Sequence, residues 1–200
     1  IMAFLMISMV SIMMPRALVS IKRIAEVLNK EVTVKDPIKP KKFNEKTKGK
    51  VEFRDVYFRY PDAEEDVLRN INFTANKGET VAFIGSTGSG KSTLINLVAR
   101  FFDVTGGKIL VDECDIKDVK IKDLREKIGF VPQKGVLFSG TIASNLKLGN
   151  EKLSKEEMKR VSQISQALEF IDKKEDGFGS PISQGGTNVS GGQKQRLAIA

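Results

Sequence analysis

The sequence predicts an α/β domain preceded by the end of a membrane-spanning helix. From Val51 onward, short β-rich segments alternate with segments of helical periodicity, which is typical of strands alternating with helices. The first 14 residues carry no charge, and cationic residues follow them at once at Arg16, Lys22 and Arg23. The 200 residues suffice for one domain with an appendage.

Residues 1–14 are expected to be the end of a transmembrane helix. As a helix they would reach only about 21 Å, short of the roughly 30 Å hydrocarbon core. No basic region precedes them and no small-residue cleavage site follows, so a signal peptide is disfavoured. Cationic residues just past an apolar span mark the cytoplasmic side, which places the chain after about residue 15 in the cytosol. The alternative is an amphipathic or core helix of a soluble protein.

Residues 15–50 are expected to form a cytoplasmic linker. Its second part, residues 32–50, has two prolines, seven lysines and little periodicity. Residues 1–50 hold 11 Lys/Arg against 4 Asp/Glu, whereas residues 51–200 hold 22 against 21. The net charge of +8 therefore belongs to the first quarter of the chain and does not indicate a nucleic-acid partner for the folded body.

Strand and helix patterns follow in order from residue 51. The segment 51–61 is β-rich, residues 76–78 form a turn, and an apolar strand is expected at 81–84. A glycine loop and a helix come next, then a strand over 106–116 and a helix end followed by a short strand at 128–133. A further helix is expected over 153–171, where Ser154 and Glu157 have the spacing of a capping box.

The stretch "GSTGSGKS" has the G-x-x-x-x-G-K-[ST] spacing of a phosphate-binding loop, with Gly85, Gly90, Lys91 and Ser92 at the defining positions. Glycines allow successive backbone N–H groups to converge on anionic oxygens, and the helix that begins here adds a partial positive charge. Lys91 would reach the β- and γ-phosphates, and Ser92 would offer its hydroxyl to Mg²⁺. An apolar segment before the loop and an apolar helix after it supply the context that the motif requires.

The stretch "SGGQ" predicts a second helix start that faces an anion. Ser190 is expected at the N-cap with Gln193 three residues later, and Gly191 and Gly192 leave the first-turn N–H groups uncovered. One nucleotide already fills its own loop, so this helix start would meet the nucleotide of another copy. A plain capped surface helix remains the alternative on these residues alone.

The stretch "NVSGGQKQRLAIA" resembles the signature motif of ATP-binding cassette (ABC) proteins. Three further stretches, "YFRYP", "IGFVPQ" and "LFSGTIASNL", occur in that family's order, and "MMPRALVSIKRIAEVLN" is similar to the last membrane helix of an exporter entering its linker. The chain thus resembles a type I exporter half-transporter, with its nucleotide-binding domain over residues 51–200. The resemblance implies a P-loop NTPase core of ABC type with antiparallel β and helical subdomains.

The resemblance also implies a set of site residues, with ATP and Mg²⁺ as cofactors. Lys91 and Gln133 would be catalytic, Ser92 and Gln133 would ligate Mg²⁺, and Tyr60 would stack on the adenine. In that family two cassettes pair head to tail, as a homodimer or a heterodimer, and the signature residues complete the partner's site. The implied nucleotide-binding residues are Tyr60, Gly85, Ser86, Thr87, Gly88, Ser89, Gly90, Lys91, Ser92, Thr93, Ser190, Gly191, Gly192 and Gln193.

The stretch "KILVDE" is similar to a catalytic carboxylate strand, because four residues, three of them apolar, precede Asp112 and Glu113. Its surroundings instead resemble a family strand with no catalytic role, in which glycine usually stands where this chain has Glu113. The resemblance places the catalytic strand after the signature helix, beyond Ala200. The domain is therefore expected to be incomplete at its C-terminus, and residues 1–200 alone are expected to bind ATP without turning it over.

The expected function is that of an ABC-type ATPase coupling cassette closure and ATP hydrolysis to export across the cell membrane. Alternatives are a nucleotide-binding module without hydrolysis and a soluble ABC ATPase unconnected to transport. The sequence has no histidine, which excludes histidine-based catalysis within these residues, and the single Cys114 forbids an internal disulfide.

Overall fold

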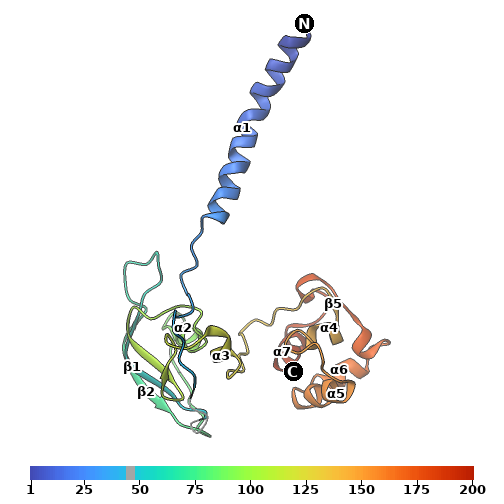
Figure 1. Ribbon diagram of the computed structural model, residues 1–200. Coiled ribbons are helices and arrows are strands. Elements are labelled where there is room, and N and C mark those ends of the chain that lie inside the picture. The colour runs from blue at the N-terminus through green and yellow to red at the C-terminus, as the bar shows by residue number, and fades with distance from the viewer. Residues whose placement is uncertain (44–47) are drawn as a thin grey trace. The chain divides into compact units, whose positions relative to one another are not determined.

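The computed structural model describes residues 1–43 and 48–200. The chain divides into two compact units, Ile1–Ile128 and Gly129–Ala200, and each is described by itself (Figure 1). The first unit contains the N-terminal helix, an antiparallel sheet and the helix that follows the glycine loop. The second unit is mainly helical.

The N-terminal helix α1 spans Met2–Leu28, and none of its side chains is buried. It continues past residue 14, so the first part of the segment predicted as linker is helical, with Pro15 inside the helix. Its 27 residues are long and apolar enough to cross a membrane, by length and composition only. At about 1.5 Å per residue, this helix is roughly 40 Å long.

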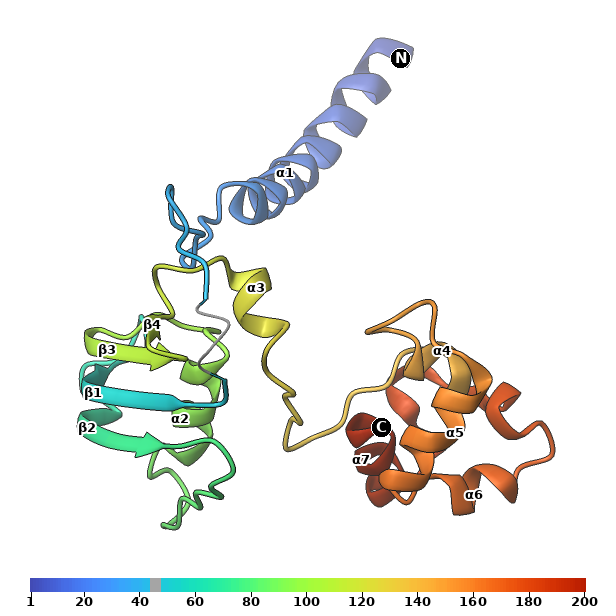
Figure 2. The same cartoon turned by 60° about the horizontal axis from the view of Figure 1, so that its bottom comes forward.

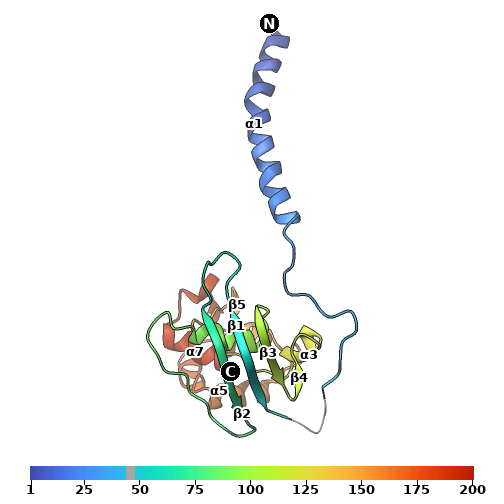
Figure 3. The same ribbon diagram turned by 90° about the vertical axis from the view of Figure 1, so that its left-hand side faces the viewer.

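Four antiparallel strands form the sheet of the first unit. They are β1 (Val51–Phe58), β2 (Leu68–Ala75), β3 (Gly106–Val111) and β4 (Cys114–Asp115), in the order β2-β1-β3-β4 (Figure 3). The predictions of a strand at 51–61 and of another within 106–116 are confirmed. Strand β2 was not predicted, although its residues alternate in burial as expected for a half-buried strand.

Helix α2 (Lys91–Val98) covers one face of this sheet (Figure 2). Its buried Leu94 and Leu97 join Phe53, Phe58 and Ile109 from the strands in one hydrophobic core. Apolar side chains removed from water contribute about 25 cal/mol per Å², so this core fixes the helix on the sheet. Helix α3 (Ile121–Arg125) follows β4 and contributes the fully buried Leu124 to the same core.

Two predicted strands do not form. Residues 81–84 and 128–133 form no regular element, and neither segment pairs with a strand among the described residues. Ile84 is 97% exposed and Val81 is 43% exposed, which is unlike a central strand. An apolar run becomes a strand only when a neighbouring strand supplies partners for its N–H and C=O groups. Both predictions are therefore wrong for this structure.

The second unit contains four helices and a core of its own. The helices are α4 (Ile142–Leu146), α5 (Lys155–Ile164), α6 (Leu168–Asp172) and α7 (Gly191–Ile199), accompanied by the two-residue strands β5 (Gly140–Thr141) and β6 (Pro181–Ile182) and the 3₁₀ turns η1 (Gly177–Gly179) and η2 (Gln184–Gly186). Helices α4, α6 and α7 contribute side chains to the core, which includes the fully buried Ile142 and Ile171 and, from α7, Leu197. This core positions the start of α7.

The helix predicted over 153–171 is interrupted. The predicted capping box of Ser154 and Glu157 forms at the start of α5. The chain then breaks at Gln166, which adopts a left-handed backbone with φ 59°, before α6 begins. The break allows the amide of Ala167 to bond the carbonyl of Ser162 at 2.8 Å, which turns the chain into α6.

Replacing Gln166 by glycine is expected to stabilise the second unit. A left-handed backbone costs an L-residue about 1 kcal/mol, and glycine avoids this cost. Gln166→Gly should therefore raise the free energy of unfolding by roughly 0.5–1 kcal/mol in urea titrations. The matched control, Gln163→Gly within α5, should lower it by about 1 kcal/mol. A loss of stability in Gln166→Gly would contradict this explanation of the break.

Candidate functional site

The glycine loop has the geometry of a backbone cradle. Gly88 and Gly90 both have φ 86°, and the amide of Ser89 donates to the carbonyl of Ser86 at 3.3 Å. A Cβ atom on Gly90 would lie 2.7 Å from Leu68 Cδ2, and one on Gly85 would lie 2.8 Å from Ser89 Oγ. Both the backbone angle and the space therefore require glycine at position 90.

The start of α2 is open to an anion. Gly90 is the N-cap and no side chain caps the helix, so the first-turn N–H groups are left for an external acceptor. The ammonium of Lys91 donates to the carbonyls of Gly85 and Ser86 at 2.8 and 2.6 Å and to Ser89 Oγ at 3.2 Å. The uncovered helix end and the ammonium together suit a polyphosphate.

The residues after Lys91 face opposite ways. Ser92 is exposed, as a hydroxyl that ligates Mg²⁺ must be, whereas the Thr93 side chain is buried. The hydroxyls of Thr93 and Tyr60 are 3.0 Å apart and share a hydrogen bond. The structure therefore brings Tyr60 together with the first turn of α2, a contact that sequence patterns did not indicate because it joins residues 33 positions apart.

The second predicted helix start forms as a capping box. Ser190 Oγ accepts from the amide of Gln193 at 3.2 Å, and Gln193 Oε1 accepts from the amide of Ser190 at 3.0 Å. Gly191 and Gly192 are exposed, and a Cβ atom on either would meet nothing within 4 Å. Neither glycine has a positive φ. The fold of this unit therefore does not require glycine at these two positions.

The predicted site residues fall into both units. Tyr60 and residues 85–93 belong to the first unit, and residues 190–193 belong to the second. Gln133 is an exposed residue of the second unit, so its role beside Ser92 stays a prediction.

Asp112 and Glu113 form a tight turn between β3 and β4. Their φ angles are 48° and 67°, which explains why glycine suits the second position. The Asp112 carboxylate accepts from the amides of Gly49 and Lys50 at 2.7 and 3.2 Å and from Lys127 Nζ at 2.8 Å. Asp112 thus fastens the end of the linker to the sheet.

The environment of Asp112 lowers the pKa of its carboxyl group. Burial alone would raise the pKa, but hydrogen bonds from Lys127 and from the amides of Lys50 and Gly49 outweigh it. Because the folded pKa lies below the unfolded one, the ionised carboxylate stabilises the fold above the unfolded pKa of about 3.9. That stabilisation is lost as the pH falls through the folded pKa.

The linker is docked onto the first unit by polar contacts. The carboxylate of Asp36 accepts from the amide of Ile121 at 2.8 Å, at the start of α3, and Lys41 pairs with Asp118 at 2.7 Å. The guanidinium of Arg100, which is 3% exposed, donates to the carbonyl of Lys35 at 3.0 Å. Sequence patterns missed these contacts, because a lysine-rich segment without periodicity predicts only a solvated chain.

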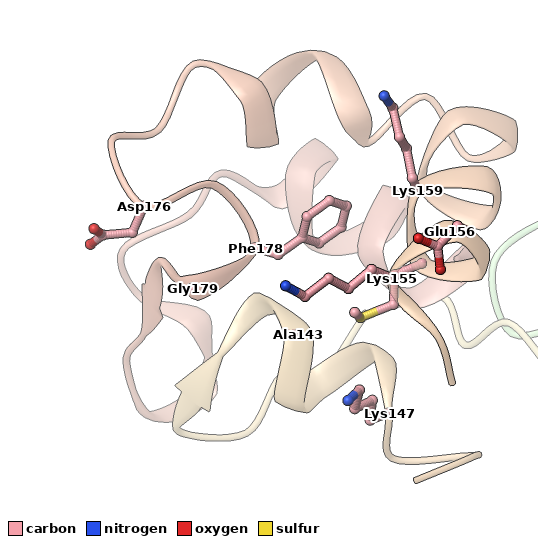
Figure 4. Close-up of a pocket in the computed structure, with 9 residues that line it drawn as sticks. Ala143, Lys147, Lys155, Glu156, Lys159, Asp176, Phe178 and Gly179 are labelled. Carbon is pink, nitrogen blue, oxygen red and sulfur yellow. The ribbon is translucent and has the colours of Figure 1, made fainter. Parts of the chain in front are cut away.

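A cavity of about 770 Å³ lies within the second unit, between α4, α5 and η1. Figure 4 shows the side chains of Phe178 and Lys155 extending into the same space, while Asp176 points away. None of the predicted site residues lines this cavity. Within the second unit it therefore shares no lining residue with the start of α7.

Comparisons with known proteins agree on the family. A family model described as ABC transporter matches residues 68–200. An uncharacterized ABC transporter ATP-binding protein of Mycobacterium tuberculosis is 43% identical over 202 residues, which cover 100% of this chain and 34% of that protein. An ATP-dependent lipid A-core flippase of Pseudoalteromonas atlantica is 45% identical over 157 residues, which cover 78% of this chain and 27% of the flippase.

A solved structure also matches almost the whole chain. The structure of a bacterial Atm1-family ABC exporter with ATP bound superposes with a TM-score of 0.83 at 32% identity, covering 97% of this chain and 34% of that one. The mixed α/β fold with antiparallel strands is therefore that of the ABC ATPase domain. The chain spans about a third of the length of the curated relatives that match it from end to end.

Replacing Asp112 by asparagine tests its structural role. The amide retains one oxygen acceptor but loses the ion pair with Lys127, so the free energy of unfolding at pH 7 should fall by about 1–3 kcal/mol. The difference from the wild type should shrink as the pH falls through the lowered pKa of the Asp112 carboxyl, because the wild-type group then becomes protonated as well. The measurement is urea unfolding at a series of pH values, with Glu151→Gln at an exposed position as the control. A difference that persists unchanged at low pH would contradict the role given to the carboxylate charge.

Proposed function

Because the chain belongs to the ABC transporter family, we propose that it is the ATP-binding and ATP-hydrolysing part of a membrane exporter. The parent protein would be a half-transporter whose cassette closes on ATP with a second half and reopens after hydrolysis. The exported cargo would be selected by membrane helices. The lipid A-core flippase among the relatives makes a lipid one candidate cargo, beside drugs and peptides.

Different residues of the first unit would bind different parts of the nucleotide. The backbone of residues 85–90 and the start of α2 hold the phosphates, and the Lys91 ammonium neutralises charge on the β- and γ-phosphates. Ser92, and Gln133 from the second unit, would ligate Mg²⁺, which offsets charge that develops on the transferred phosphoryl group. Tyr60 would stack on the adenine base.

The exposed glycines at the start of α7 support a nucleotide site that two cassettes share. The fold does not need glycine at 191 and 192, since a Cβ atom there would meet no neighbour within 4 Å. Bare backbone at a capped helix start is explained when an anion approaches it from outside the chain. We assign that anion to the nucleotide held by Lys91 of a second copy or of a related half.

The membrane connection follows from α1 and the docked linker. Helix α1 would cross the membrane as the last helix of the membrane domain, with the linker and both units on the cytoplasmic side. Arg100 lies two residues beyond the end of α2 and bonds the linker at Lys35. Movement at the phosphate end of α2 would therefore reach α1 through the docked linker.

The alternative of nucleotide binding without turnover applies to residues 1–200 taken alone. The Asp112 carboxylate accepts three hydrogen bonds from the chain itself and is not free to act on a water molecule. Hydrolysis would then need a carboxylate other than that of Asp112. Residues 1–200 are expected to bind ATP and to release no phosphate.

Replacing Lys91 by alanine tests nucleotide binding. Loss of charge-assisted hydrogen bonds should weaken ATP binding by about 10- to 100-fold in calorimetric titrations. The full-length protein should lose ATP hydrolysis with it. Lys122→Ala, at an exposed lysine of α3, keeps the net charge matched and should bind ATP as the wild type does. Equal affinities of the Lys91→Ala and Lys122→Ala variants would contradict the proposed function.

Replacing Asp36 by alanine tests the role of the docked linker. Without the bond to the Ile121 amide, tryptic cleavage within residues 29–43 of the full-length protein should become about 2- to 10-fold faster. Cargo exported per ATP hydrolysed should fall, while ATP affinity stays unchanged. Asp36→Asn keeps an oxygen acceptor and should behave as the wild type does. Export that is unaffected by faster linker cleavage would contradict coupling through this segment.

A further inference from the structure

We propose that Tyr60 positions the phosphate-binding helix through its hydroxyl group, in addition to stacking on a base. The inference rests on the proposed nucleotide binding. It concerns a second action of Tyr60 at the triphosphate, carried by the hydrogen bond between Tyr60 and Thr93. An aromatic residue that only stacked on adenine would not need this hydroxyl.

The ring of Tyr60 is fixed before it meets any ligand. It packs edge-on against Phe58, with ring centroids 4.8 Å apart, and edge-on against Phe102, at 5.2 Å. Phe58 ends β1 and Phe102 follows α2, so the ring joins the sheet to the segment after the helix. These contacts aim the hydroxyl at the first turn of α2.

Thr93 is the residue on which that hydroxyl acts. It is the third residue of α2 and is only 7% exposed. Its backbone N–H lies in the first turn, where no side chain caps the helix. A shared hydrogen bond restricts the rotation of the Thr93 side chain and thereby holds the first turn in place for phosphate oxygens.

The two hydroxyls can also form part of a hydrogen-bond chain. When Tyr60 donates to Thr93, the Thr93 hydroxyl hydrogen is left to donate in its turn, and hydrogen bonds in such a chain strengthen one another. Tyr60 thus contributes to phosphate affinity whether or not a base is present. It is a positioning residue for the phosphates, acting through Thr93.

The test compares ATP with inorganic tripolyphosphate, which has no base. Tyr60→Phe keeps the ring and loses the hydroxyl, so it should weaken the binding of both ligands by the same factor, about three- to tenfold. Tyr57→Phe is the matched control, since Tyr57 is the other tyrosine of the chain and is exposed on β1, and it should bind both ligands as the wild type does. The titrations use the full-length protein at a temperature where circular dichroism shows every variant folded.

A double-mutant cycle with Thr93 gives an independent readout. Thr93→Val should weaken tripolyphosphate binding as Tyr60→Phe does, and the double variant should be no weaker than either single variant, because both remove the same bond. Thr93→Ser keeps the hydroxyl and should restore most of the affinity. The same non-additivity should appear in the free energy of unfolding without ligand.

The outcomes separate this inference from the proposed function. A wild-type protein that binds neither ATP nor tripolyphosphate overturns both. A wild-type protein that binds tripolyphosphate, with an unchanged affinity in Tyr60→Phe, overturns the inference alone. Additive losses in the Tyr60 and Thr93 double variant overturn it as well, since the two side chains would then act separately.

Discussion

The uncovered start of α2 is the feature on which the rest of the first unit depends. A helix end carries about half a positive charge, and its first N–H groups need acceptors. Here Gly90 leaves them without a side-chain cap, and Leu68 of the sheet packs so closely that no Cβ atom fits at that position. The sheet, the loop and Lys91 together keep this helix end available for a strong external acceptor, for which the phosphates of ATP are suited.

The C-terminal end of α2, unlike its start, is capped by a side chain. Arg125 donates to the carbonyls of Ala99 and Arg100, at 3.1 Å each. These carbonyls just past the helix end thereby gain hydrogen-bond donors. The Arg100 side chain donates to the carbonyl of Ile116 and, in the linker, to that of Lys35. The eight-residue helix α2 therefore joins the open phosphate end to the residues that bond the linker.

Local patterns predicted the parts of the structure that local chemistry determines. The glycine loop, both predicted capping boxes and the strand from Val51 follow from residue types at fixed spacings. The strands expected at 81–84 and 128–133 did not form, because an apolar run also needs a partner strand. The contact between Tyr60 and Thr93 and the docking of Asp36 on α3 were not predictable, since each joins segments far apart in sequence without a periodic pattern.

The central claim is that the helix start at Gly90 of one subunit and the helix start at Ser190 of another hold the same nucleotide. Mixed dimers of the full-length protein test it with Lys91→Ala and Ser190→Arg, placed either in the same subunit or in different subunits, and with bound nucleotide counted per dimer after trapping. A shared site predicts that substitutions in different subunits leave one nucleotide trapped per dimer, whereas substitutions in the same subunit leave none. The reverse pattern would show that each subunit builds its site alone and would contradict the claim.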